Sequence, residues 1–342
     1  MDWLLLAVSL VVILAGAELF TNGIEWVGEG FGLSEGAVGS VLAAVGTALP
    51  ETLLPLVAIL SGHHAGSEIG IGAILGAPFM LTTLAMAVIA VAVLTSARGG
   101  RRPAELSFDE KVVRHDLGYF LIMYALAVVA GLAHAKTLDV LLSIGLVVGY
   151  VYYVRRHFSA ERAPEFVEGE VKPLYARRWL ARVRRDGPDP SADPSDPAPY
   201  VQVAVSLAAI IGGADLFISA VDGIADRFGV PPLAFALLVA PVATELPEKF
   251  NSVLWVRRRK DTLALGNMTG AMVFQSSFPV TIGLLLTPWQ LAHEALVASL
   301  IALLAGGVLY LTVRFRHRLT ARLLLFQALL YIGYVAYVAT KL

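Results

Sequence analysis

Long apolar stretches alternate with short polar ones along the whole sequence. A helix that crosses the hydrocarbon core of a bilayer needs about 20 apolar residues. Ten stretches are of about this length, and a longer polar segment, 157–199, divides them five and five. They lie near 3–23, 34–61, 68–96, 117–134, 137–155, 200–222, 231–256, 262–286, 290–313 and 321–340. The pattern predicts an all-α polytopic membrane protein with ten transmembrane helices.

The two groups of five stretches are related in sequence. Between Ile13 and Glu51, 14 of 39 positions are identical to the position 197 residues further on, without a gap. An odd number of helices per group would turn the second group upside down relative to the first. We therefore expect two inverted five-helix repeats, 1–156 and 200–342, joined by the linker 157–199.

Basic residues are segregated along the chain. Of the 26 Lys and Arg residues, 22 fall in the four segments 98–116, 155–185, 257–260 and 314–322, which lie on one side of a ten-helix arrangement. Loops rich in Lys and Arg stay in the cytoplasm. This asymmetry predicts an integral protein of the cell membrane with an outside N-terminus and a cytoplasmic 157–199 linker.

Composition supports the membrane class and narrows the chemistry. Hydrophobic residues make up 57% of the chain, and the mean hydropathy is +0.72. The chain has no cysteine, which excludes disulfides and thiolate metal sites. No catalytic Ser/His, His-Glu-x-x-His or paired-Asp spacing occurs in the predicted helices, so the sequence disfavours an intramembrane enzyme.

A carboxylate follows a proline inside an apolar stretch of each half. The motifs read GTALPE at 46–51 and ATELPE at 243–248. A charged side chain inside a membrane is costly and marks an ion pathway by default. Each proline also frees the carbonyl four residues earlier, and hard cations such as Ca²⁺ bind mixtures of carboxylate and carbonyl oxygens. We therefore expect Glu51 and Glu248 to form a central cation site.

A glycine-rich helix follows each motif. Gly72 and Gly76 in the first copy, and Gly266 and Gly270 in the second, are spaced four residues apart. Small residues at this spacing allow close packing of membrane helices, and we predict such packing in both copies.

The paired G-T-x-L-P-E and G-N-x-x-G-x segments resemble the repeats of the sodium/calcium exchanger family, within the cation/Ca²⁺ antiporter superfamily. The chain would be a divergent prokaryotic-type member, with motifs at 46–81 and 243–277. The resemblance implies Ca²⁺ exchanged against Na⁺ or H⁺ by alternating access around the two glutamates, with no cofactor. The candidate cation ligands are Thr47, Glu51, Thr244, Glu245, Glu248, Asn267 and Gln275.

Several positions depart from the family pattern. The serine of the family motif is replaced by Ala48 and Glu245, and the later serine by Ala77 and Ala271. The Asn or Asp four residues beyond is Leu81 in the first half and Gln275 in the second. We therefore expect fewer or weaker Na⁺ sites than in the family, with proton coupling as the substitute.

Two further groups of charged residues are candidates for supporting roles. Glu245 and Lys249 stand four residues apart with the acid first, which favours a helical ion pair. Glu245 is then either a counter-ion of Lys249 or a direct cation ligand, and either residue could carry the coupled proton. Glu18 and Asp215 match across the 197-residue offset near helix ends, where we expect structural hydrogen bonds.

The sequence alone leaves two alternative functions open. A monovalent cation/proton antiporter would suit a site with fewer oxygen ligands, and a non-transporting membrane protein would leave two buried glutamates unexplained. In each case the expected partners are inorganic cations and the lipid bilayer, with no nucleic acid.

Overall fold

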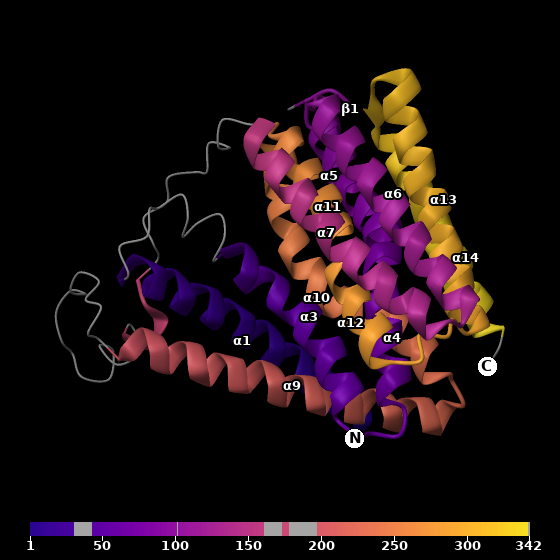
Figure 1. The fold of residues 1–342 in the computed structure, drawn as a ribbon. Coiled ribbons are helices and arrows are strands. Elements are labelled where there is room, and N and C mark those ends of the chain that lie inside the picture. The colour runs from indigo at the N-terminus through magenta and orange to yellow at the C-terminus, as the bar shows by residue number, and fades with distance from the viewer. Residues whose placement is uncertain (31–42, 101, 161–172, 178–196, 341–342) are drawn as a thin grey trace.

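The computed structural model describes residues 1–30, 43–100, 102–160, 173–177 and 197–340, and these are almost entirely helical (Figure 1). The helices of the first half are α1 (Asp2–Gly30), α3 (Ala43–Leu60), α4 (Gly66–Met80), the π-helix η2 (Leu81–Ala85), α5 (Met86–Arg98), α6 (Glu110–Ala133) and α7 (Lys136–Ala160). Those of the second half are α9 (Ala198–Phe228), α10 (Pro232–Arg257), α11 (Asp261–Gln275), α12 (Phe278–Leu286), α13 (His293–Arg316) and α14 (Ala321–Ala339).

Eight helical segments of the described chain are long and apolar enough to cross a membrane. Two shorter apolar helices, Ala48–Leu60 and Pro232–Val242, belong to α3 and α10, where the other two predicted spans lie. The prediction of an all-helical membrane protein is thus confirmed, and ten spans in two repeats are consistent with this arrangement.

Two predicted helices, 68–96 and 262–286, are not regular α-helices along their whole length. The first changes to the π-helix η2 after Met80, and the second breaks between α11 and α12. A hydroxyl donates to a carbonyl of the preceding turn at each break: Thr83 to Phe79 at 2.5 Å and Ser277 to Val273 at 2.9 Å. Such bonds compete with the helical ladder and accompany bends in membrane helices.

The first helices of the two halves, α1 and α9, lie side by side and run obliquely to the other helices (Figure 1). They have 29 and 31 residues, more than the about 20 needed to span a bilayer, and excess length is accommodated by tilt. Their contact is reciprocal: a Cβ at Gly16 would lie 2.9 Å from Ile210, and one at Gly213 would lie 2.9 Å from Ile13. Both pairs are related by the 197-residue offset, as expected for a two-fold contact between related halves.

Three of the basic segments meet at one end of the molecule. The strands β1 (Glu105–Leu106) and β2 (Leu319–Thr320) pair as a two-residue antiparallel sheet, which joins the segment before α6 to the one after α13. Arg102 forms a buried two-bond ion pair with Asp261, at 2.7 and 2.6 Å, and ties the same segment to the start of α11. This clustering agrees with the sidedness predicted from the basic residues.

Candidate functional site

Glu51 lies on α3 directly after Pro50, and the residue is only 6% exposed. It borders a small cavity of about 10 Å³, enclosed by α3, α4 and α10. The cavity is lined by Pro50, Glu51, Leu54, Pro55, Ala73, Ala77, Ala240, Pro241 and Thr244. A cavity of this size has room for about one water molecule or ion. The first half thus contributes a buried carboxylate to a cavity that the second half helps to close.

The glycines of α4 allow α10 to pack closely against α4. A Cβ at Gly72 or Gly76 would overlap the carbonyl oxygens of Leu233 and Leu237 on α10. Pro241 has no N–H to bond the carbonyl of Leu237, so this carbonyl is left at the contact. The close packing predicted for the first glycine pair is confirmed.

The same prediction is wrong for the second pair. Within the described chain, a Cβ at Gly266 would meet nothing within 4 Å, and one at Gly270 would meet only the Tyr153 hydroxyl, at 3.7 Å. A different residue of α11, Thr269, contacts α6: its hydroxyl donates to Asp116 at 2.6 Å. Equivalent glycines therefore occupy different surroundings in the two halves.

Glu245 lies in a buried polar cluster with two other predicted residues. Lys249 Nζ lies 3.1 Å from Glu245 Oε2, and Gln275 Nε2 donates to Glu245 Oε1 at 2.5 Å. All three residues are buried. The predicted ion pair is confirmed, and both carboxylate oxygens of Glu245 have protein partners.

The other candidate ligands are placed unequally. Thr244 lines the cavity with Glu51, although its hydroxyl donates to Ala240 at 3.2 Å. Asn267 instead donates to Ser252 at 3.0 Å and does not line that cavity. The side chains of Thr47 and Glu248 lie outside the described part of the structure. By backbone position, Glu248 stands one helical turn after Thr244 on the same face of α10.

Two pairs of buried hydroxyls lie at the helix breaks, Thr82 and Thr83 in the first half and Ser276 and Ser277 in the second. The two serines stand out in the sequence as polar residues after the second glycine-rich helix, whereas the two threonines were missed. The two pairs match at an offset of 194, which also relates Phe79 to Val273, the carbonyls that Thr83 and Ser277 bond. This second, shifted offset was the signal in the sequence.

Glu18 and Asp215 make the hydrogen bonds expected of structural residues. Tyr175 donates its hydroxyl to Glu18 at 2.8 Å, and the His63 ring lies 3.2 Å from Asp215. Neither carboxylate lines the cavity beside Glu51 in the described structure.

Comparison with known proteins identifies the family. The model of the family described as sodium/calcium exchanger protein matches residues 1–158 and 199–340. The inner membrane protein YrbG of Escherichia coli is 23% identical over 84% of this chain and 80% of its own length. The putative antiporter CaxA of Alkalimonas amylolytica is 22% identical over 82% and 79%.

Solved structures have the same fold. The H⁺/Ca²⁺ exchanger CAX superposes with a TM-score of 0.73 at 16% identity, over 98% of this chain and 82% of its own. The sodium-calcium exchanger NCX_Mj superposes with a TM-score of 0.56 at 19% identity, over 98% and 99%. With a family match over nearly the whole chain outside the linker, this protein belongs to the sodium/calcium exchanger family, whose members are secondary transporters and not enzymes.

Proposed function

We propose that this protein is a secondary antiporter that binds Ca²⁺ beside Glu51 and exchanges it for protons by alternating access. The observation that carries the proposal is the buried carboxylate of Glu51 in a cavity formed by both halves of the chain. Similarity to exchangers whose names specify Ca²⁺ supports the choice of cation.

The ligands proposed for Ca²⁺ are the carboxylates of Glu51 and Glu248 with the hydroxyl of Thr244. Glu51 and Thr244 line one cavity, and Glu248 stands one turn further along α10. Ca²⁺ takes six to eight oxygens, so backbone carbonyls freed by the prolines would complete the set.

The apolar character of the cavity supports protons as the coupling ion. Ala77 lines the cavity where the family has a serine, and Leu81 is fully buried in η2. Gln275 is bound to Glu245, whose charge is balanced by Lys249. Na⁺ would find few side-chain oxygens among the described residues here, whereas two carboxylates accept either one Ca²⁺ or two protons with the same change in charge.

Transport by the purified chain in proteoliposomes tests the proposal. Ca²⁺ uptake is measured with a pH gradient alone, a Na⁺ gradient alone and neither gradient. We expect uptake to follow the pH gradient and to change little with Na⁺. Uptake that requires Na⁺ and ignores the pH gradient would show that backbone oxygens restore the sodium sites.

The same proteoliposomes test the second candidate function, a monovalent cation/proton antiporter. Its support is the small number of side-chain oxygens among the described residues that line the cavity. If the second candidate is right, protons will move in vesicles loaded with K⁺ or Na⁺ and will not move in vesicles loaded with Ca²⁺. Proton movement with Ca²⁺ alone is the result expected from the main proposal.

A further inference from the structure

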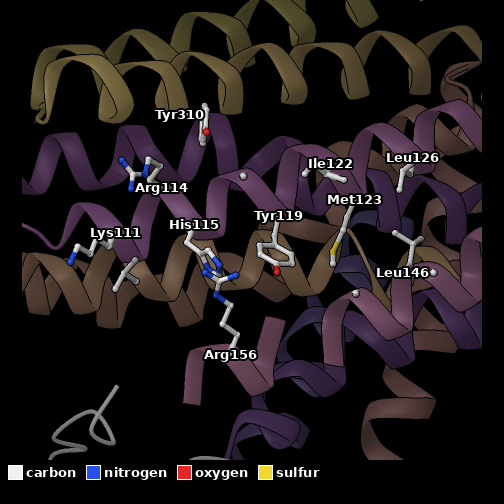
Figure 2. A pocket seen from close by; sticks show the side chains of 14 residues that line it. Lys111, Arg114, His115, Tyr119, Ile122, Met123, Leu126, Leu146, Arg156 and Tyr310 are labelled. Carbon is white, nitrogen blue, oxygen red and sulfur yellow. The ribbon is translucent and has the colours of Figure 1, made fainter. Parts of the chain in front are cut away.

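A large groove runs between α6 and α7, with Tyr310 of α13 on one wall (Figure 2). Its volume is about 670 Å³, which falls in the range of about 300–1,000 Å³ typical of pockets for small organic molecules. Its described lining residues are all different from those around the cavity beside Glu51. The groove therefore needs an explanation of its own.

One end of the groove is cationic. Lys111, Arg114 and His115 of α6 line this end, and Arg156 reaches towards them from α7 (Figure 2). Lys111, Arg114 and Arg156 form no ion pair with any carboxylate of the described chain. Three positive charges thus gather here without a described counter-charge.

The carboxylates next to this end on α6 are engaged elsewhere. Asp116 is buried and accepts hydrogen bonds from Tyr153 and Thr269, at 2.9 and 2.6 Å. Glu110 lies 2.7 Å from the ring of His317. No described carboxylate of α6 is therefore left to neutralise the three cations, which suits a site for an anion from outside the protein.

The other end of the groove is apolar. Ile122 and Leu126 are 65% and 38% exposed on α6, and Met123 and Leu146 form a buried wall (Figure 2). Gly145 of α7 lines the same stretch, and a Cβ there would meet nothing within 4 Å in the described structure. The absence of a side chain at Gly145 keeps this end open.

The length of the groove matches one leaflet of a bilayer. Arg114 and Leu126 are twelve residues apart on one helix, or about 18 Å along its axis. Half of the hydrocarbon core of a bilayer is about 15 Å. A molecule with its charged group at Arg114 would thus extend its apolar part to about the middle of the membrane.

We propose that this groove binds one anionic phospholipid from the leaflet next to the basic segments. Its phosphate lies among Lys111, Arg114 and Arg156, and one acyl chain follows Ile122 and Leu126. Basic pockets between transmembrane helices are a recurrent form of anionic lipid site. The site does not depend on which ion the protein transports.

Native mass spectrometry of the delipidated full-length protein tests the site, with phosphatidylglycerol or phosphatidylcholine added back. The test variant replaces Lys111, Arg114 and Arg156 by Gln. Its control replaces Arg257, Arg258 and Arg322 by Gln, which removes three exposed cations outside the groove. A third variant, Gly145→Trp, fills the apolar end and keeps every charge.

We expect the wild type and the control to bind phosphatidylglycerol in preference to phosphatidylcholine. The groove triple variant should lose on the order of a hundredfold in phosphatidylglycerol affinity, and Gly145→Trp should also bind less of it. Equal binding of the two lipids by the wild type would overturn the proposal. So would equal losses in the two triple variants, or displacement of the lipid by excess inorganic phosphate. A change in oligomer mass with unchanged lipid binding would instead assign the groove to a protein contact.

Discussion

Glu51 is the residue on which the proposed exchange depends most. Glu51→Gln keeps the size of the side chain but removes the charge that a divalent cation requires. We expect exchange to fall below detection in proteoliposomes while the thermal unfolding temperature stays near that of the wild type. Glu68→Gln is the matched control, since Glu68 is an exposed acid on the next helix. Normal exchange by Glu51→Gln would remove this residue from the cation site.

The buried pair of Glu245 and Lys249 has a different expected role. Lys249→Met leaves a buried carboxylate without its cation, a change that typically costs about 3–5 kcal/mol. The double variant Lys249→Met/Glu245→Gln removes both charges and should recover most of this stability. Thermal unfolding in detergent measures both effects. Equal destabilisation of the single and double variants would mean that the ion pair is not what stabilises this cluster.

Some of these residue roles could be predicted from spacing alone. The four-residue separation of Glu245 and Lys249 correctly predicted their ion pair. The same reasoning failed for Gly266 and Gly270, because spacing reports which residues share a helix face but not which neighbour that face meets. The partner of Asn267, Ser252, was likewise hidden, since it depends on how α10 and α11 pack.

Among the connecting elements, the segment between α5 and α6 is held by the buried pair of Arg102 and Asp261. Asp261 also accepts from the Ser107 backbone at 2.8 Å. Asp261→Asn leaves a buried guanidinium without a counter-charge, and we expect a loss of about 3–5 kcal/mol in unfolding free energy. Glu105→Gln is the control, because its ion pair with Arg318 is exposed and exposed pairs contribute about 0–1 kcal/mol. Similar losses in both variants would contradict this distinction.

The helical elements themselves were largely predictable from apolar length. All ten predicted stretches correspond to described helices, because a chain in lipid must satisfy its backbone hydrogen bonds internally. The breaks after Met80 and Gln275 were not predicted, since hydropathy does not distinguish a straight helix from two shorter ones. The hydroxyls that bond the preceding turn carry this information, and they are too few to change the apolar pattern.

At the scale of the whole molecule, the sidedness of the chain in the membrane is open to direct measurement. Asp186→Cys lies in the linker and His134→Cys at the exposed end of α6, away from the basic segments. The chain has no native cysteine, so each variant carries one thiol. A membrane-impermeant maleimide applied to intact cells should label His134→Cys only, and both after lysis. Labelling of Asp186→Cys in intact cells would reverse the orientation.

The proposed alternating access would account for the unequal surroundings of the two glycine pairs, with the structure in one of two states related by the pseudo-two-fold axis of the repeats. If the halves exchange conformations during transport, Gly266, which meets no described atom within 4 Å, must become as crowded as its counterpart Gly72 is now. The Gly266→Leu variant should then fold normally, but its larger side chain should block the change to the other state. Such a protein would bind ⁴⁵Ca²⁺ from one side of the membrane and never release it on the other. Wild-type turnover by Gly266→Leu would mean that exchange does not require close packing at Gly266.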